Sequence, residues 1–198
     1  EIWYPGYKQR NTGKFLMLTE HQLIAELAQI AEASEKVGQR TRNIYLGAGW
    51  FNEEQQNILM QGYQALKANP TINDIYVPLL NQYGGQVIEA DGDFEPDFEW
   101  GTMTYKADIT AMNNADLIVA FIDAADPDSG TAFEIGYMTA SNKPAILVTV
   151  GDRNEHPVNL MLSYGAVSNV DLETEGFEAL EKFDFTNIAM KKWVGSIL

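Results

Sequence analysis

The chain has 198 residues, enough for a single domain that buries a large core without disulfide or metal crosslinks. It contains no cysteine and only two histidines, which excludes thiol nucleophiles, disulfide frameworks and a three-histidine zinc site. Thirteen basic and 28 acidic residues give a formal net charge of −15, which disfavours binding to the phosphate backbone of nucleic acids.

No apolar run approaches the roughly 20 residues that a transmembrane helix needs. The first residues also lack the pattern of a secretory signal. We therefore expect a cytoplasmic protein that interacts with neither membranes nor nucleic acids.

Residues 1–42 stand apart from the rest of the chain as an N-terminal extension that we expect to be mainly helical. Thr19-Glu-His-Gln22 has the form of a capping box, in which the first and fourth residues cap a helix reciprocally. A helix of about 18 residues is expected to follow, with Leu23, Leu27 and Ile30 on one face. The role of this extension is open at the sequence level.

Strands and helices alternate from residue 43 onward. Short, nearly continuous apolar runs typical of buried parallel strands occur at 43–47, 74–78, 115–122, 145–150 and 166–170. Helical patterns lie between and after them, near 52–69, 99–113, 130–141, 158–164 and 174–183. This order predicts a single α/β domain over residues 43–198. Its architecture would be a doubly wound, flavodoxin-like parallel sheet of five strands with helices on both faces.

Two loops at the carboxyl ends of predicted strands are candidate ligand sites. The first, residues 47–51, carries Gly47 and Gly49, which allow close approach of the backbone to a ligand. The second spans residues 123–129. Neither GxGxxG nor GxxxxGK[ST] occurs, so a dinucleotide or triphosphate site is disfavoured.

Three carboxylates surround the second loop. Asp128 stands at the predicted cap of the next helix, Glu134 lies about one turn inside it, and Asp108 is on the preceding helix. Such a group suits acid–base and nucleophilic work at a glycosidic centre. It equally suits an oxygen-ligand site for a divalent cation, or a set of solvated and capping residues. The residues alone leave these alternatives open.

Five segments, in this order, resemble the nucleoside 2-deoxyribosyltransferase family over about residues 43–185. They are Ile44-Tyr-Leu-Gly-Ala-Gly-Trp-Phe51, Tyr76-Val-Pro-Leu-Leu-Asn-Gln-Tyr83, Thr104-Tyr-Lys-Ala-Asp108, Asp128-Ser-Gly-Thr-Ala-Phe-Glu-Ile-Gly-Tyr137 and Val158-Asn-Leu-Met161. Residues 1–42 have no counterpart in the minimal family domain. The end of the chain, 191–198, also differs from the short aromatic end usual in the family.

The resemblance implies an enzyme that exchanges the base of a deoxynucleoside through a covalent deoxyribosyl intermediate on Glu134. Asp108 would hold the sugar or assist proton transfer to the departing base. Asp128 would help to bind the base or act as the acid beside it. Tyr45 would orient the Glu134 carboxylate by a hydrogen bond. No cofactor or metal is implied.

The resemblance also implies a set of substrate contacts and a shared site. Gly47, Trp50, Phe51 and Gln82 would lie near the base. Asn159 and Met161 would come from a neighbouring subunit and contact the region of the sugar 5′-hydroxyl. The active unit implied is a homo-oligomer, a hexamer or another dimer-based assembly, acting on deoxynucleosides and free purine or pyrimidine bases in nucleoside salvage.

Two other functions fit the same residues. A relative of the same fold would hydrolyse the N-glycosidic bond of a nucleoside or a nucleoside 5′-monophosphate, again through Glu134. A non-catalytic nucleoside-binding domain would use the pocket without chemistry, with residues 1–42 as a coupled regulatory part.

Overall fold

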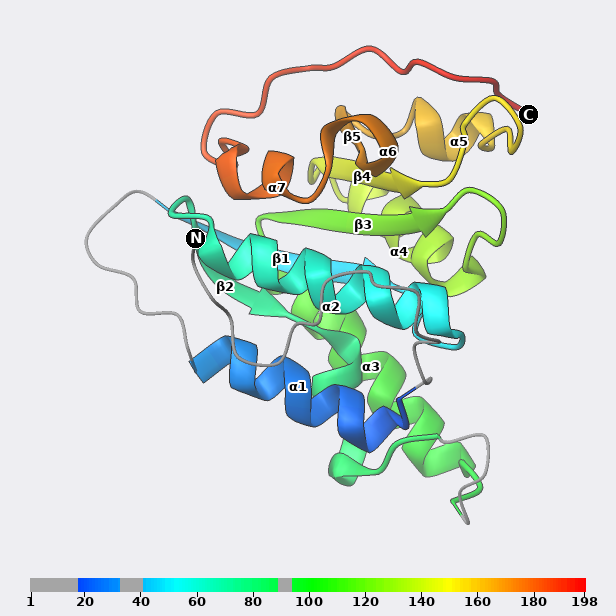
Figure 1. The fold of residues 1–198 in the computed structure, drawn as a ribbon. Helices are drawn as coiled ribbons and strands as arrows, with labels where there is room; N and C mark the ends of the chain where they lie inside the picture. The colour runs from blue at the N-terminus through cyan, green and yellow to red at the C-terminus, as the bar shows by residue number, and fades with distance from the viewer. Residues whose placement is uncertain (1–17, 33–40, 89–93) are drawn as a thin grey trace.

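A five-stranded parallel sheet forms the centre of the computed structural model, which describes residues 18–32, 41–88 and 94–198 (Figure 1). Its strands pair in the order β2-β1-β3-β4-β5. They are β1 (Arg42–Ala48), β2 (Ile72–Tyr76), β3 (Leu117–Asp123), β4 (Ala145–Val150) and β5 (Ser168–Asp171). The predicted flavodoxin-like sheet of five parallel strands is thereby confirmed.

Helices cover both faces of the sheet. In Figure 1, α2 (Glu53–Ala68) and α7 (Glu178–Lys182) lie in front of it, and α3 (Phe98–Asn114) and α4 (Ser129–Ala140) lie behind. The strand order reverses between β1 and β3, whose following helices α2 and α4 lie on opposite faces. The loops after these two strands therefore diverge at the point where α/β sheets of this kind bind their ligands.

Alternate residues of the central strands enter two separate cores. Ile44 and Leu46 of β1 pack with α2 in one core, whereas Tyr45 belongs to the core beneath α3 and α4. β3 is buried along its length up to Ile122, as expected for a strand covered on both faces. The period of two along β1 is what directs the Tyr45 side chain toward α4.

The N-terminal helix α1 (Glu20–Glu32) packs on the outer side of α2 (Figure 1). The predicted capping box is confirmed, because the Gln22 N–H donates to Thr19 Oγ1 and the Thr19 N–H donates to Gln22 Oε1. Leu23 and Leu27 are fully buried on its inner face. The described part of the helix has 13 residues, and the rest of the predicted length would fall in residues 33–40. Residues 1–17 and 33–40 of the extension lie outside the described residues.

Several predicted bounds differ from the structure by one or two residues, and two differences have a clear cause. The second strand ends at Tyr76, and Pro78 begins the short 3-10 helix η1 (Pro78–Leu80), because proline has no N–H to give to a ladder. The single closing helix predicted at 174–183 is two short helices, α6 (Leu172–Glu175) and α7. Gly176 separates them with a φ of 64°, a conformation that favours glycine and ends a helix.

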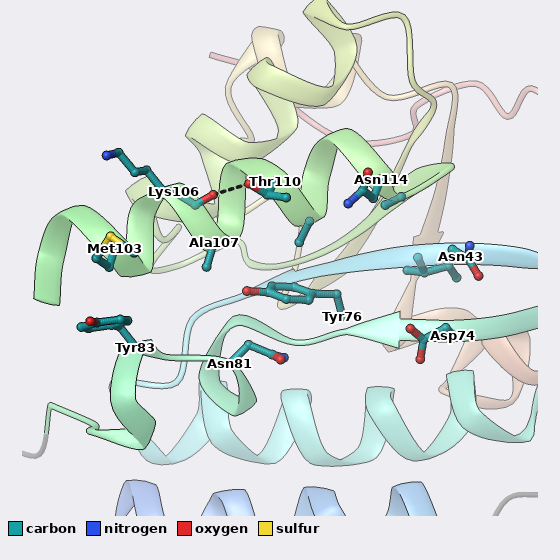
Figure 2. Close-up of a pocket in the computed structure, with 13 residues that line it drawn as sticks. Asn43, Asp74, Tyr76, Asn81, Tyr83, Met103, Lys106, Ala107, Thr110 and Asn114 are labelled. Carbon is teal, nitrogen blue, oxygen red and sulfur yellow. Dashed lines mark hydrogen bonds between the residues drawn. The ribbon is translucent and has the colours of Figure 1, made fainter.

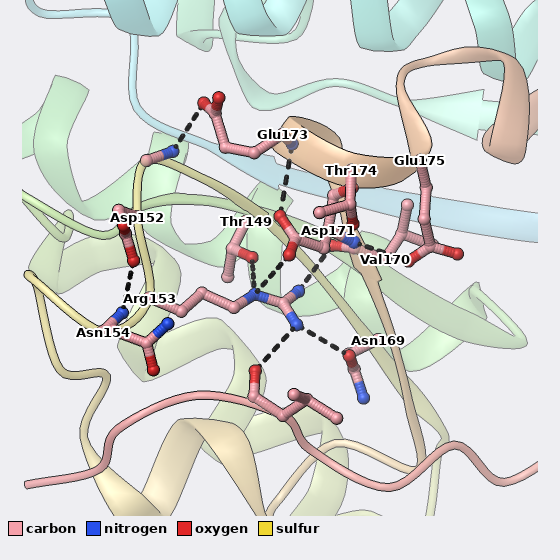
Figure 3. A network of polar contacts seen from close by, with 12 residues as sticks. Thr149, Asp152, Arg153, Asn154, Asn169, Val170, Asp171, Glu173, Thr174 and Glu175 are labelled. Atoms are coloured by element: carbon pink, nitrogen blue, oxygen red, sulfur yellow. Dashed lines mark hydrogen bonds and ion pairs between the residues drawn. The ribbon is translucent and has the colours of Figure 1, made fainter.

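The last six residues return to the segment before α5 (Leu160–Ser163). Val158 and Leu160 exchange backbone hydrogen bonds with Ser196 and Leu198. Arg153 anchors this segment from a nearly buried position. Its guanidinium lies 4.3 Å from the ring centroid of Trp193 and donates to the Val194 carbonyl. Figure 3 shows the same guanidinium beside Thr149 and Asn169. The end of the chain therefore braces the 158–161 segment.

Among the described residues, no helix is both long and apolar enough to cross a membrane. The cytoplasmic location expected from the sequence stays a prediction.

Candidate functional site

Glu134 and Tyr45 form the centre of the candidate site. The Tyr45 hydroxyl donates a hydrogen bond of 2.5 Å to Glu134 Oε1, joining β1 to α4 across 89 residues of sequence. Tyr45 is fully buried. A phenol fixed in this way can hold the carboxylate in one orientation, as the sequence predicts for this pair.

Asp108 enters the same cluster through a second tyrosine. The Tyr76 hydroxyl donates to Asp108 Oδ1 at 3.0 Å, and the Tyr76 ring stacks on Tyr45 with centroids 5.5 Å apart. Tyr45 and Tyr76 are register partners on adjacent strands, which explains the stacking. Two parallel tyrosine–carboxylate pairs therefore stand side by side.

Burial dominates the electrostatics of both carboxyls. It raises the pKa of Glu134 to about 8, against the lowering effect of the Tyr45 hydrogen bond, and the charges of Asp108 and Asp128 raise it further. Burial also raises the pKa of Asp108 to about 6, while the Tyr76 hydrogen bond lowers it. Burial, followed by the nearby carboxylates, raises the pKa of both tyrosines far above the usual range. Near neutral pH the cluster thus favours a state in which a proton is retained on one carboxyl.

Asp128 caps α4. Its Oδ2 accepts from the backbone N–H of Thr131 at 2.6 Å and from the Thr131 hydroxyl at 2.8 Å. Its charge contributes to the raised pKa of Glu134, which puts Asp128 within electrostatic reach of that carboxyl. The predicted cap is confirmed, and a role at the base stays a prediction.

The absence of a side chain at Gly47 leaves room for the Glu134 carboxylate. A Cβ at this position would lie 2.7 Å from Glu134 Oε2, closer than carbon and oxygen can approach without a shift. The following loop carries Trp50 and Phe51, whose rings are 5.0 Å apart. Phe51 is 63% exposed, which leaves its ring free to contact another molecule.

Gln82 holds an unusual polar atom. Its Oε1 is buried and has no hydrogen-bond partner among the described residues. A buried acceptor without a partner is costly, so a donor on a ligand would stabilise it. The residue predicted to lie near the base therefore has an unused acceptor.

Asn159 and Met161 lie at the start of α5. The Asn159 side chain caps α5 by accepting from the Met161 N–H at 2.9 Å, and Met161 is 73% exposed. Among the described residues, neither side chain bonds to Tyr45, Asp108 or Glu134. Their predicted contact with a neighbouring subunit's site is untested.

A groove of about 600 Å³ runs beside the tyrosine pair, between the free edge of β2 and α3 (Figure 2). Tyr76 forms part of its wall and also bonds to Asp108, so one side chain contacts both the groove and the carboxylate cluster. Tyr83, Met103 and Lys106 line the same groove.

Sequence reasoning did not single out Tyr76 or Gln55. The signal for Tyr76 was its place opposite Tyr45 in neighbouring parallel strands, which becomes visible only when the register is known. The Gln55 side chain accepts from the Phe51 N–H at 2.9 Å and fills the space beside Gly49. Its position one turn after the loop gave no separate signal.

No group of three or more His, Asp or Glu side chains is placed to hold a metal ion within the described ranges.

A sheet with this strand order, with partly buried carboxyls at the carboxyl ends of its strands, defines an α/β protein equipped for acid–base or nucleophilic chemistry. Residues 44–161 match the family model described as nucleoside 2-deoxyribosyltransferase, more than half of the chain. The chain therefore belongs to the nucleoside 2-deoxyribosyltransferase family, a family of pentose-transferring enzymes, as its sequence motifs predict.

Curated relatives agree with the family match. The chain is 35% identical over 131 residues to a nucleoside deoxyribosyltransferase of Lactobacillus leichmannii, covering 65% of this chain and 83% of the relative. It is also 35% identical over 148 residues to one of Limosilactobacillus fermentum, covering 73% and 86%. A solved 2-deoxyribosyltransferase of Bacillus psychrosaccharolyticus superposes with a TM-score of 0.62 at 26% identity, over 77% of this chain and 99% of that one.

Proposed function

We propose that this protein transfers 2-deoxyribose between nucleobases, with Glu134 as the nucleophile and retention of configuration at C1′. The observation that carries the proposal is the 2.5 Å hydrogen bond from Tyr45 to Glu134, beside the Tyr76–Asp108 pair. A partly buried carboxylate oriented by one phenol, next to a second carboxyl of raised pKa, suits retaining glycosyl transfer.

In the first half-reaction, a carboxylate oxygen of Glu134 attacks C1′ of the deoxynucleoside. The state that reacts is the one in which the single proton of the cluster lies on Asp108 and Glu134 is ionised. The N-glycosidic bond breaks, its electron pair goes to the base nitrogen, and Asp108 gives that nitrogen the proton. A sugar without a 2′-hydroxyl forms an oxocarbenium-like centre readily, so the two carboxyls suffice for the chemistry. The product is a deoxyribosyl ester of Glu134 and a free base.

In the second half-reaction, a nitrogen of the incoming base attacks C1′ from the side that the first base left. The ester bond breaks, its electron pair returns to the Glu134 carboxylate, and the proton of the attacking nitrogen passes to Asp108. Two displacements at one carbon restore the original configuration. Trp50 and Phe51 wall the base, and Gln82 Oε1 accepts a hydrogen bond from it.

Base exchange is measured directly by incubating the enzyme with deoxyinosine, with and without adenine. Formation of deoxyadenosine is expected, together with slow release of hypoxanthine when no acceptor is present. Release of base at the same rate with and without adenine, and without deoxyadenosine, would instead identify a hydrolase. Glu134→Ala should abolish exchange; unchanged exchange would remove Glu134 from its assigned role. EDTA should have no effect.

We further propose that the enzyme works as a homo-oligomer in nucleoside salvage, with Asn159 and Met161 completing a neighbour's site. Large apolar side chains are exposed on and around α3, α4 and α5, a pattern that marks protein interfaces. They are Phe98, Met103, Tyr105, Phe133, Leu160, Met161 and Tyr164. Residues 43–198 would form the catalytic domain and residues 1–42 an added extension.

A further inference from the structure

The side-chain amide of Gln56 joins the N-terminal segment to the loop that follows β1. Its Nε2 donates to the carbonyls of Leu18 (2.9 Å) and Trp50 (3.3 Å), and its Oε1 accepts from the Leu18 N–H at 3.0 Å. Gln56 is only 2% exposed, so water does not replace these partners. A buried amide that loses its partners is costly, so these bonds favour keeping Leu18 and Trp50 in place.

Helix α1 fixes the position of Leu18. The capping box of Thr19 and Gln22 starts the helix immediately after it, and fully buried Leu23 and Leu27 fasten the helix to the core that includes α2. The side chains of Leu18 and Trp50 pack against that same core cluster. The packing of α1 therefore determines where the partner of Gln56 lies.

The other end of the connection is the backbone of the Trp50–Phe51 loop. Gln56 holds the Trp50 carbonyl, and the neighbouring Gln55 holds the Phe51 N–H at 2.9 Å. Both glutamines are buried. Two consecutive side chains of α2 thus hold the two polar ends of one peptide group, the one that joins Trp50 to Phe51. One of these side chains, Gln56, depends on α1 for its remaining partners.

We propose that Gln56 is a positioning residue through which α1 fixes the Trp50–Phe51 loop against the bound nucleobase. The proposal rests on the proposed function, which assigns these two aromatic residues to the base. Helix α1 precedes residues 44–161, which match the family model, so this brace is added to the family domain. Loss of the Gln56 hydrogen bonds should weaken binding of the base and admit water to the site, with little effect on the chemical step.

The direct test is Gln56→Met, which keeps the length of the side chain and removes all three hydrogen bonds. We expect KM for the deoxynucleoside to rise about fivefold to tenfold while kcat changes less than about twofold, the signature of lost binding rather than lost chemistry. The share of the deoxyribosyl intermediate lost to water should rise as well. Gln61→Met is the matched control, because the Gln61 amide bonds to Asn57 on its own helix, and KM should not change.

Leu27→Ala loosens α1 without touching the loop and provides an independent variant. It should raise KM in the same direction. The KM of the double variant, Leu27→Ala with Gln56→Met, should exceed that of the more affected single variant by less than about twofold. This is expected because both substitutions act through one connection. A lower melting temperature with unchanged KM and unchanged hydrolysis in both single variants would overturn the proposal.

Amide hydrogen exchange separates this proposal from the proposed function, because it needs no substrate. Exchange at Trp50 and Phe51 should be about tenfold faster in Gln56→Met than in the wild type or in Gln61→Met. If the wild type shows no base exchange at all, the proposed function fails, yet faster amide exchange would still support the brace. Unchanged amide exchange at the loop would contradict the brace whatever the activity.

Discussion

At the scale of single residues, the carboxyls that the proposed reaction uses also reduce the stability of the fold. Burial raises the pKa of Glu134 to about 8, so keeping this carboxyl ionised in the folded protein costs free energy. Tyr45 offsets part of that cost by its hydrogen bond, and Tyr76 does the same for Asp108. A site of this kind lowers the free energy of unfolding in return for a reactive carboxylate.

Glu134→Gln should therefore abolish base exchange and stabilise the protein at alkaline pH. Because the folded pKa lies above the unfolded one, the wild type is penalised progressively as pH rises from about 4.5 to about 8. The neutral amide escapes this penalty. We expect a gain of about 2–4 kcal/mol in the free energy of unfolding at pH 8.5 and little change at pH 4.5. Urea unfolding at the two pH values measures it.

The exposed carboxylate Glu181 provides the control for that series. Glu181→Gln should change stability by less than about 0.5 kcal/mol at either pH. A Glu134→Gln protein that is equally stable, or less stable, at pH 8.5 than the wild type would show that burial does not penalise this carboxylate.

Gly47→Ala should separate activity from stability. The new methyl group would meet Glu134 Oε2 at 2.7 Å, and the far end of a side chain moves more easily than backbone. Ile118 and Thr131 are also close, so a loss of about 1 kcal/mol in stability is expected. Because a displaced nucleophile misses C1′, kcat should fall at least about 100-fold. Activity within about threefold of the wild type would contradict the placement of Glu134 against Gly47.

At the scale of the elements, the sequence predicts those helices and strands whose bounds depend on a local pattern of apolar residues. The strand at 145–150 has the predicted bounds because both of its faces are buried and its residues are apolar or small throughout. The break at Gly176 was missed because a helical pattern continues across it, and only the backbone shows the positive φ. The Tyr76–Asp108 contact was missed because Tyr76 in an apolar run is typical of strand core.

The C-terminal segment shows how one buried side chain can fasten an irregular element. Arg153 donates to Thr149, Asn169 and Val170 on β4 and β5 and lies 3.9 Å from Asp171 (Figure 3). It also holds the tail at Val194 and Trp193. The tail in turn pairs with Val158 and Leu160, on either side of Asn159. Arg153 therefore supports the segment that we assign to a neighbour's site.

Arg153→Met should release that tail. The loss of the buried guanidinium leaves several acceptors unpaired, and we expect a loss of about 3 kcal/mol in the free energy of unfolding. Trypsin should cleave faster after Lys191 and Lys192, and the fluorescence of Trp193 should shift to the red as it becomes solvated. Lys182→Met, which removes an exposed ion pair with Glu178, should show neither change. Unchanged proteolysis in Arg153→Met would mean that the tail is held by other contacts.

At the scale of the whole molecule, charge and exposed surface restrict the partners. The net charge of −15 and the carboxyl cluster at the site oppose a phosphate group, which favours neutral deoxynucleosides over nucleoside 5′-monophosphates. Exposed Met161 and Leu160 lie beside Asn159, and exposed apolar side chains of this kind suit a segment that contacts another copy of the chain.

A shared site predicts complementation between two defective variants. Glu134→Gln and Asn159→Ala should each be impaired, and mixed oligomers formed by subunit exchange should regain up to about a quarter of the wild-type sites. This follows because half of the pairs are mixed and one site of each mixed pair then has both native residues. Native mass spectrometry establishes that mixing has occurred. Mixed oligomers without recovered activity would contradict the sharing of Asn159.

The central claim is the covalent role of Glu134, and intact-protein mass spectrometry tests it most directly. Wild-type protein quenched in acid after incubation with a deoxynucleoside, without acceptor base, should gain the mass of one deoxyribosyl group, located by peptide mapping at Glu134. Glu134→Gln should show no gain. A wild type that turns over without an adduct, or an equal adduct on Glu134→Gln, would contradict the account.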